Sequence, residues 1–523
     1  MRHTYILLGF LCAANAIQAQ DTSTVRREPG PPAVQSTRGM VVCSSGIACE
    51  AGARMLAKGG NAVDAAVATA FAMAVTYPAA GNIGGGGFML VRTPKKVTSI
   101  DFRERAPARS TPTMYLDSVG NINRRLTATG YLAPGVPGTV RGLEMAHRKY
   151  GRLKWPDVVA PAAQLATGGF PLSESLARSL NRELSRMQLY PASVAAYGKP
   201  GGGEWKTGDT LRLPDLGRSL EAVARGGADA FYNGWIADSI AADMARGGGL
   251  IDAKDLKDYR AKEREPVHGT YRGYDVHSMP PPSSGGIAIV EMLNVLEPMN
   301  LRQRDRWSAS SLHLVIEAMR HAFLDRARSL GDPDFVKVPV SELTSKRYAA
   351  QVAREIDPEH AANSATLAPD LLGTKADESD ETTHISVVDS AGMAVSLTYT
   401  LEGGFGSHVV ARGTGILLNN EMGDFNKKPG FTSTSGDIGT APNAIAPGKR
   451  MLSSMSPTII TRDKDVVLVT GSPGGRTIIN TVFNVVLGVL EYDADVRTAV
   501  DAPRFHHQWL PDTVVFEGGA IPD

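Results

Sequence analysis

The chain has 523 residues, of which 42% are hydrophobic, so it can bury a large core and is far longer than a small binding module. Its 55 Lys and Arg residues nearly balance its 54 Asp and Glu residues, which gives a formal net charge of +1. Neither a basic run nor an alternation of basic and aromatic residues occurs, which excludes the usual composition of nucleic-acid-binding proteins. This length predicts two to four domains or one large α/β sandwich.

The first twenty residues have the composition of a secretory signal peptide. Arg2 precedes a short apolar run, and small residues follow at Ala14, Ala16 and Ala19. We predict a signal peptide over residues 1–19 and a flexible leader over residues 20–38. The alternative, a membrane anchor, is not favoured because the apolar run is too short to cross a bilayer. We therefore expect a secreted or periplasmic protein with no membrane span after signal removal.

Strands and helices alternate from residue 39 to about residue 360. The alanine-rich stretch 62–75 follows the helix-start signal Gly60-Asn61 and ends before Pro78, which predicts a buried core helix rather than a membrane span. Other elements are expected as strands over residues 39–42 and 91–102, and as helices over residues 45–56, 136–149, 155–167, 227–246, 252–256, 287–296 and 308–330.

Cysteine and histidine spacing gives little evidence of a metal centre. Cys43 and Cys49 could form a disulfide in an oxidising compartment, but free thiols buried on a strand and the next helix fit the sequence at least as well. No CxxC or HExxH spacing occurs. His506-His507 is a weak candidate because neighbours on an extended segment point to opposite faces. We predict no metal site.

An exposed linker is expected over residues 361–381, because this stretch is small, polar and acidic and has no apolar period. A β-hairpin is predicted after it, with strands over residues 383–388 and 393–400. Thr382, at the junction, is either an ordinary first residue of a strand or a nucleophile that is created by cutting the chain.

The second part of the chain is expected to be rich in strands. Further strands are predicted over residues 408–418 and 457–470, followed by a helix over residues 476–490. A helix-rich first part and a strand-rich second part that meet at an exposed linker fit a layered sandwich.

Three glycine-rich loops lie at residues 81–87, 282–286 and 471–476. None has the spacing of a phosphate-binding loop, and no Lys follows any of them. The third follows an apolar strand and precedes a helix, so its amide N–H groups could stabilise an oxyanion. Plain tight-turn glycines are the alternative.

Charged side chains near predicted strand ends could hold an amino acid. Arg103 could bind a carboxylate through two hydrogen bonds, or form a surface ion pair with Asp101 or Glu104. The acids Glu421 and Asp424 would suit an ammonium group, or belong to a solvated turn.

Ser453 and Ser454 offer paired hydroxyls before a strand, although serine pairs more often only solvate a loop. Together with a hydroxyl nucleophile, amide donors and the charged groups, they indicate attack on an amide whose far end is an amino acid.

Ten motifs cover the chain from about residue 39 to its end: GGNAVDAAVA (59–68), GNIGGGGFM (81–89), DFRERAP (101–107), SMPPPSSGG (278–286), LGDPDFVKVP (330–339), TTHISVVD (382–389), GTGILLNNEMGDF (413–425), LSSMSPT (452–458), GSPGG (471–475) and APRFHHQWLPD (502–512). In these motifs and their order, the chain resembles the gamma-glutamyltransferase (glutathione hydrolase) family of N-terminal-nucleophile hydrolases. Chance does not supply ten such matches.

The resemblance implies a four-layer αββα sandwich made as one precursor that cleaves itself between Glu381 and Thr382. The large subunit would comprise residues 39–381 and the small subunit residues 382–523. The Thr382 hydroxyl would attack the preceding carbonyl, and the freed α-amine would then serve as general base, because an α-amino pKa of about 7.7 to 8.0 lies near working pH. No cofactor is implied.

The resemblance also implies the roles of the site residues. Thr400 would orient Thr382, and Gly474 and Gly475 would form the oxyanion hole. The α-carboxylate of the substrate would be held by Arg103, Ser453 and Ser454, and its α-ammonium by Glu402, Glu421 and Asp424. Glutathione and other γ-glutamyl compounds would be donors, and water or an amino acid or peptide amine would be the acceptor.

Some positions depart from better-known members. Glu381 stands where Gln is frequent, Glu402 stands where some members have Asn, and the lid loop 429–446 has no Tyr to close over the site. These departures bear on acceptor choice and on the ratio of transfer to hydrolysis. The chain also ends at Asp523, short of the family's last strands, so the small subunit is expected to be C-terminally incomplete.

Two other functions compete with γ-glutamyl transfer. One is an acylase on the same scaffold that removes glutaryl side chains from β-lactams, although the acids Glu402, Glu421 and Asp424 would repel an acyl group without an amine. The other is a secreted binding protein that keeps the pocket and never cleaves. The presence of Thr382, Thr400 and the Gly474-Gly475 pair argues against the binding protein.

Overall fold

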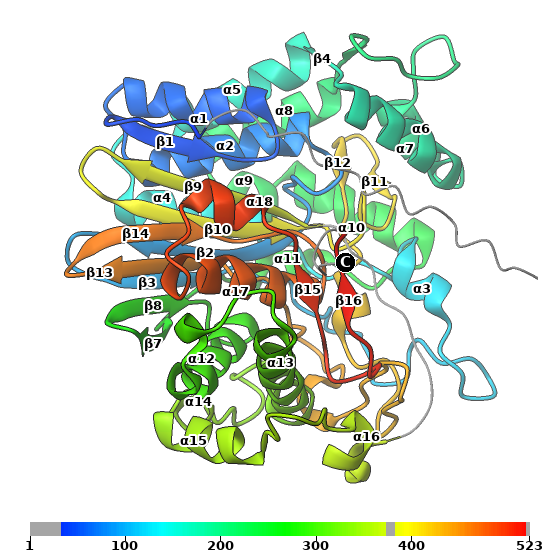
Figure 1. The fold of residues 1–523 in the computed structure, drawn as a ribbon. Coiled ribbons are helices and arrows are strands. Elements are labelled where there is room, and N and C mark those ends of the chain that lie inside the picture. Colours follow the sequence, from blue (N-terminus) through cyan, green and yellow to red (C-terminus); the bar gives the residue numbers. More distant parts are fainter. Residues whose placement is uncertain (1–32, 373–381, 519–523) are drawn as a thin grey trace, which may run out of the picture.

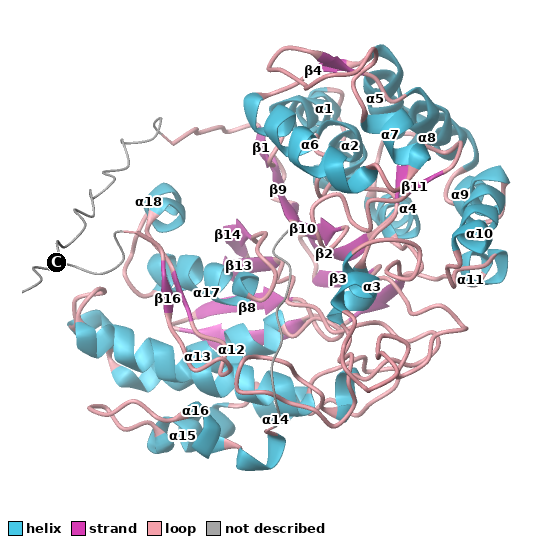
Figure 2. Cartoon of the chain, turned by 90° about the vertical axis from the view of Figure 1, so that its right-hand side faces the viewer, coloured by secondary structure: helices cyan, strands magenta, loops and turns pink. Residues whose placement is uncertain are grey.

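The computed structural model describes residues 33–372 and 382–518. The expected signal peptide, most of the expected leader and Glu381 lie outside the described residues. Two sheets lie face to face, and each is covered by helices on its outer side (Figures 1 and 2). In the part of the chain that is described, no helix combines the length and the apolar character needed to cross a bilayer.

The first sheet joins strands from both sides of residue 381. Its order is β1 (Gly39–Val42), β9 (Thr383–Asp389), β10 (Ala394–Thr400), β2 (Gly86–Arg92), β3 (Val97–Asp101) and β6 (Lys262–Arg264), all antiparallel. The predicted hairpin β9–β10 is confirmed, but it does not lie in a separate strand-rich half. It is inserted between β1 and β2, so a cut before Thr382 would leave two chains that share one sheet.

The second sheet has the order β14 (Asp465–Thr470), β13 (Thr458–Arg462), β8 (Tyr274–Ser278) and β7 (Val267–Tyr271). Alternation along β2 explains how the sheets pack, because successive side chains of a strand point to opposite faces. Met89 and Val91 belong to the apolar cluster beneath the first helical layer, whereas Phe88 and Leu90 belong to the cluster that includes the second sheet. The two sheets also share hydrogen bonds, such as that from the Ser396 hydroxyl to the Thr470 carbonyl at 2.9 Å.

The outer layer of the first sheet is built on α2 (Ala62–Thr76), whose 15 residues are all buried as the alanine-rich pattern predicts. Asn61 and Asp64 form a capping box at its start. The other helices on this side of the molecule are α1 (Gly46–Ala57), α3 (Arg124–Ala128), α4 (Thr139–Tyr150), α5 (Trp155–Gly168), α6 (Glu174–Met187), α7 (Pro191–Tyr197), α8 (Pro214–Gly226), α9 (Asp229–Tyr232), α10 (Trp235–Gly247) and α11 (Ala253–Lys257).

The outer layer of the second sheet contains α12 (Gly285–Leu296), which packs on β7 and β8 with all its residues buried. The helices around it are α13 (Ala309–Ser329), α14 (Val340–Leu343), α15 (Lys346–Glu355), α17 (Thr477–Leu490) and α18 (Val496–Asp501). Three short strand pairs complete the fold: β4 (Phe170–Pro171) with β5 (Thr210–Leu211), β11 (Val410–Ala411) with β12 (Ile416–Leu417), and β15 (Phe505–His506) with β16 (Val515–Phe516).

Two expectations from the sequence are wrong in detail. The stretch 408–418 holds only the short strands β11 and β12, because a turn with Gly413 and Gly415 at positive φ interrupts it. The stretch 361–372 is not a plain loop: it forms α16 (Ser364–Leu367), capped by Asn363, and a 3₁₀ turn, Pro369–Leu371. This segment is ordered by tertiary contacts, including the bond from the Trp509 indole N–H to the Ser364 carbonyl at 2.8 Å.

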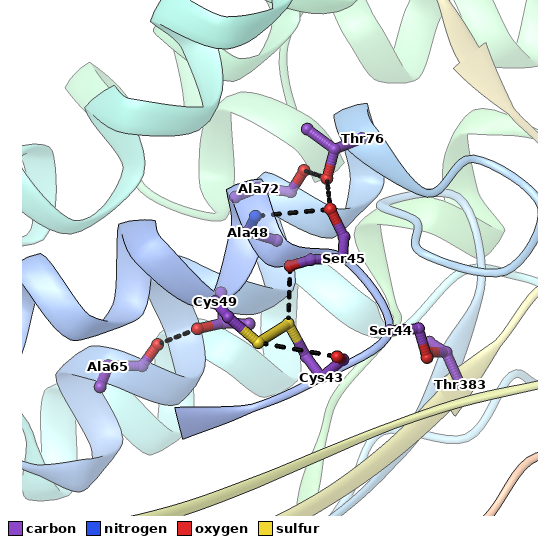
Figure 3. Close-up of a disulfide and its surroundings, with 10 residues drawn as sticks. Cys43, Ser44, Ser45, Ala48, Cys49, Ala65, Ala72, Thr76 and Thr383 are labelled. Carbon is purple, nitrogen blue, oxygen red and sulfur yellow. Dashed lines mark hydrogen bonds between the residues drawn. A yellow bond between two sulfur atoms is a disulfide. The ribbon is translucent and has the colours of Figure 1, made fainter. Parts of the chain in front are cut away.

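The structure resolves the state of the two cysteines in favour of a disulfide between Cys43 and Cys49 (Figure 3). It ties the end of β1 to the first turn of α1. Between them, the Ser44 hydroxyl lies 3.3 Å from the Thr383 hydroxyl, so the disulfide loop contacts the residue that follows Thr382. The free-thiol alternative does not hold.

Candidate active site

Thr382 and Thr400 face each other at one end of the β9–β10 hairpin. Thr383 of β9 pairs with Tyr399 of β10, and continuing this antiparallel register by one residue places Thr382 opposite Thr400. Thr382 is 5% exposed and Thr400 is 3% exposed. The Thr400 hydroxyl accepts a hydrogen bond from the Glu402 N–H at 2.8 Å. The hairpin therefore brings the two predicted threonines together and fixes the Thr400 side chain.

Both threonines line one cavity with most of the other predicted site residues. These are Arg103, Glu402, Glu421, Asp424, Ser453, Ser454 and Gly475, and the lining also includes Arg326, Met455, Arg476 and Ile478. They come from segments as far apart as the end of β3 and the start of α17, so only the folded chain assembles them.

The third glycine-rich loop connects β14 to α17 beside this cavity. Gly474 has φ +124° and Gly475 φ +53°, conformations that favour glycine. Gly475 lies in the cavity lining, whereas Gly474 precedes it and its carbonyl accepts a hydrogen bond from the Thr477 N–H at 3.0 Å. The tight-turn interpretation is confirmed, and the donor interpretation stays a prediction that fits a turn at the start of a helix.

The same loop packs directly against the strand that carries Thr382. A Cβ added to Gly471 would come within 2.2 Å of the His384 ring. His384 is fixed in turn, with Nδ1 2.8 Å from the Thr398 hydroxyl and Nε2 2.9 Å from the Ser386 hydroxyl. The sequence analysis missed this contact, which couples the glycine loop to β9.

Burial lowers the pKa of His384 to about 3. In the unfolded chain this histidine titrates near its usual pKa of about 6.5. The unfolded state therefore binds the proton first, and the stability that the neutral ring contributes above pH 6.5 is lost as pH falls from about 6.5 to about 3.

We expect the free energy of unfolding of His384→Asn to fall less steeply with decreasing pH than that of the wild type. Between pH 6.5 and pH 4 the wild-type free energy of unfolding should fall by about 2 to 3 kcal/mol more than that of the variant, measured by urea unfolding at a series of pH values. Exposed His360 provides the matched control, since His360→Asn should keep the wild-type slope. If the free energy of unfolding of His384→Asn had the same pH dependence as that of the wild type, the lowered pKa of His384 would be contradicted.

Arg103 is 1% exposed and lies among three acids. One guanidinium nitrogen is 2.6 Å from Glu421, the other contacts Asp424, and Glu104 lies at 3.7 Å. Burial alone would lower the pKa of Arg103, but Glu421 and Asp424 outweigh it and raise the pKa further. Arg103 is therefore not part of a surface ion pair, which was the alternative considered from the sequence. It is buried, and it contacts Glu421 and Asp424, two of the acids that are expected to hold an ammonium group.

One guanidinium cannot neutralise three buried carboxylates. Burial raises the pKa of Glu421 well above its ordinary value, against the attraction of Arg103. Burial also raises the pKa of Glu104 to about 8, again opposed by Arg103. Arg103 is the one described side chain that pairs with the carboxyls of Glu104 and Glu421. The cluster therefore favours protonated carboxyls and holds more acids than Arg103 can neutralise.

Ser453 and Ser454 are buried and held from behind by the second glycine-rich loop. The Ser453 carbonyl accepts the Ser284 hydroxyl at 2.7 Å. Arg326 of α13 bonds to the Ser284 hydroxyl at 3.0 Å and to the Ser454 hydroxyl at 3.2 Å. Arg326 is a second buried cation of the cavity that sequence reasoning missed, because its helix pattern gives no signal that one arginine points inward.

The expected lid loop and the two neighbouring histidines lie beside the cavity. Ser435 and Asp437 of the loop line a cavity of about 470 Å³ that shares Asp424 with the one around Thr382. The Asn480 amide donates to His506 Nδ1 at 2.8 Å, whereas His507 Nε2 lies 3.1 Å from Asp512. The two rings thus have different partners.

Comparison with known proteins identifies the family. The model of the family described as Gamma-glutamyltranspeptidase matches residues 48–523. The chain belongs to this family. It is 48% identical over 492 residues to a glutathione hydrolase proenzyme of Escherichia coli strain K12, which covers 94% of this chain and 84% of that protein. It is also 36% identical over 494 residues to the acylase ACY 1 proenzyme of Pseudomonas sp. strain SE83, covering 93% of this chain and 85% of that one.

Solved structures of similar proteins have the same mixed α/β fold. A cephalosporin acylase from Bacillus halodurans superposes with a TM-score of 0.79 at 26% identity, covering 94% of this chain and 87% of that chain. The gamma-glutamyltranspeptidase of Helicobacter pylori gives a TM-score of 0.62 at 41% identity, covering 63% of this chain and 95% of that chain. Proteins named as γ-glutamyl enzymes and proteins named as acylases thus both occur among those similar to this chain.

Proposed function

We propose that this chain is the precursor of a γ-glutamyltransferase and glutathione hydrolase with Thr382 as its nucleophile. The observation that carries the proposal is the single cavity that joins Thr382 and Thr400 to buried Arg103 and its acids. Such a cavity offers a nucleophile at one end and both charge types for an amino-acid headgroup at the other. The relatives named glutathione hydrolase proenzyme support the same activity.

Maturation would begin with attack of the Thr382 hydroxyl oxygen on the carbonyl carbon of Glu381. The C–N bond between these residues breaks as the ester bond forms, and the α-amine of Thr382 takes up a proton. Water then hydrolyses the ester, which releases the Glu381 carboxylate and restores the hydroxyl. The products are subunits of residues 39–381 and 382–523 that remain together as a heterodimer, because β9 and β10 are central strands of a shared sheet. The architecture is thus that of an N-terminal-nucleophile αββα sandwich.

In the mature enzyme the α-amine of Thr382 would accept the hydroxyl proton as the oxygen attacks the γ-amide carbonyl. Backbone N–H groups at Gly474 and Gly475 stabilise the oxyanion, and Thr400 orients the nucleophile. The leaving amine takes the proton, and the γ-glutamyl ester remains on Thr382. Water or an acceptor amine then attacks the ester and regenerates the hydroxyl.

The other residues of the cavity would bind the amino-acid headgroup of the donor. Arg103, Ser453 and Ser454 hold the α-carboxylate, and the acids Glu402, Glu421 and Asp424 hold the α-ammonium. The contact of Arg103 with Asp424 and Glu421 places these two charge types side by side, as the α-carbon of an amino acid requires. No metal or cofactor has a role in these steps. The predicted signal peptide supports export to the periplasm or beyond.

A glutaryl acylase is the second candidate, favoured by the similarity to acylases. γ-Glutamyl-p-nitroanilide and glutaryl-p-nitroanilide separate the two, since they differ only in the α-amino group. We expect a preference of at least about 100-fold in kcat/KM for the γ-glutamyl donor, because glutaryl lacks the ammonium group that the acids in excess of Arg103 would bind. A preference for glutaryl would establish an acylase, and an uncut chain with no activity on either would indicate a binding protein.

A further inference from the structure

A second cavity, of about 390 Å³, adjoins the cavity around Thr382. Glu402 lines both cavities, and the backbone of Gly403 and Gly404 continues from it along the second one. The Glu402 N–H is bonded to Thr400, so this wall is continuous with the nucleophile's hairpin. The second cavity therefore begins at Glu402, beside the hairpin that carries Thr382 and Thr400.

The lining of this second cavity has a surplus of positive charge. Arg124, Arg186 and Lys427 contribute cations, and Glu402 is the single acid. Arg186 is paired with Glu183, at 3.1 Å. Within residues 33–372 and 382–518, no side-chain hydrogen bond or ion pair engages Lys427, which leaves its ammonium available to an anion.

One carboxylate outside the lining offsets part of this surplus. Asp437 lies 3.6 Å from Arg124, and burial raises the pKa of Asp437 against the opposing effect of Arg124 and Lys427. Burial also lowers the pKa of His408, despite its contact with Glu183, so its ring is neutral near pH 7. By contrast, the larger cavity under the expected lid sets two aspartates, Asp424 and Asp437, against its cations.

We propose that the cavity of Arg124 and Lys427 binds the carboxylate of the group on the far side of the scissile amide. The ligand class is an amino acid or short peptide with a free C-terminal carboxylate, either as the leaving amine of the donor or as the acceptor amine. The inference rests on the proposed function and extends it, because it assigns acceptor preference to residues outside the γ-glutamyl site. Arg124 and Lys427 are specificity residues rather than catalytic ones.

The test compares glycylglycine with glycylglycinamide as acceptors from γ-glutamyl-p-nitroanilide. The two acceptors differ only in the terminal carboxylate. Wild-type protein should show a lower KM for glycylglycine than for glycylglycinamide. Lys427→Gln and Arg124→Gln should each reduce the ratio of the glycylglycinamide KM to the glycylglycine KM by about tenfold, equivalent to about 1.4 kcal/mol. Arg124 lines this cavity and not the larger one, so the Arg124→Gln variant also shows which of the two cavities binds the carboxylate.

Lys428→Gln is the matched control, since it removes the same charge from the neighbouring residue. The Lys428 ammonium lies 4.2 Å from the centre of the Phe431 ring and is absent from the cavity lining. Its variant should keep the wild-type KM ratio. If Arg124→Gln does not fold, Lys427→Gln still tests the need for this cation, although Lys427 lines the larger cavity as well.

Two results would overturn the inference. One is a wild-type enzyme that treats both acceptors alike while releasing p-nitroaniline, which would leave the proposed function intact. The other is an equal loss of selectivity in Lys428→Gln, which would show a general charge effect. A wild-type protein that releases no p-nitroaniline would overturn the proposed function itself and, with it, the inference.

Discussion

Replacement of Thr382 by alanine is expected to leave one uncut chain that has lost γ-glutamyl transfer. The variant lacks the oxygen that is proposed to start cleavage and to carry the acyl group, so kcat should fall by about 10⁴-fold or more. Intact mass and denaturing electrophoresis of the purified protein report the cleavage, and p-nitroaniline release reports the activity. Wild-type protein should give two fragments, the smaller beginning at Thr382.

Thr383→Ala is the control for this experiment. Thr383 is also a buried threonine at the start of β9, but its hydroxyl contacts Ser44 rather than the cavity around Thr382. The variant should still cut and keep activity within about tenfold of wild type, because it loses one neutral hydrogen bond. Cleavage of Thr382→Ala at the same position would refute Thr382 as the nucleophile. Loss of cleavage in Thr383→Ala alone would indicate that Thr383 is the nucleophile instead.

Local patterns were sufficient to predict much of the fold. Apart from Asp64 and Thr69, residues 62–75 are apolar or small on all sides, a pattern that predicts a fully buried helix when it is too short to span a membrane, and α2 is one. The β-branched alternation around Ser390-Ala391-Gly392 predicted β9 and β10 within one residue. Both features depend on neighbours in the sequence, so a single sequence carries them.

Features that depend on distant parts of the chain were not accessible in this way. The insertion of β9 and β10 between β1 and β2 is set by packing of two sheets rather than by strand propensity. Residues 361–372 have a polar composition typical of a loop, yet contacts with Trp509 order a short helix there. Local composition therefore predicted the wrong state.

In the site, too, local motifs predicted some features, and contacts between distant segments determined others. Motifs indicated which residues carry chemistry, and the structure brings Thr382, Arg103 and Asp424 to one cavity. Motifs did not reveal that Arg103 contacts its acids directly, or that Arg326 reaches Ser454 from another layer. Charge pairing between residues more than 300 positions apart leaves no periodic signal in one sequence.

Arg103→Met is expected to lower both stability and activity, for separable reasons. Methionine keeps the apolar stem and removes the charge, which leaves Glu421, Glu104 and Asp424 without their buried counter-ion. Removal of one partner from a buried ion pair typically costs about 3 to 5 kcal/mol. Urea unfolding should show a loss of this size above pH 8, where Glu104 is ionised, and a smaller one at pH 5, where its carboxyl is protonated and does not need the cation.

The loss of activity should depend on the donor. γ-Glutamyl-p-nitroanilide has the α-carboxylate that Arg103 is proposed to hold, whereas 4-aminobutanoyl-p-nitroanilide lacks it. We expect Arg103→Met to reduce kcat/KM for the first donor by about 100-fold more than for the second, since a charge-assisted contact contributes about 1.5 to 3 kcal/mol.

Arg103→Lys separates charge from geometry. Lysine keeps the counter-ion for Glu421 and Asp424 but not the planar fork, so it should restore most of the stability and only part of the donor preference. Equal losses on both donors in Arg103→Met would reduce Arg103 to a structural residue, and the carboxylate would then fall to Arg326 with Ser454, the other buried cation and hydroxyl of the cavity. Glu421→Gln in the Arg103→Met background should recover stability at pH 8, because it removes one of the carboxyls that the arginine neutralises.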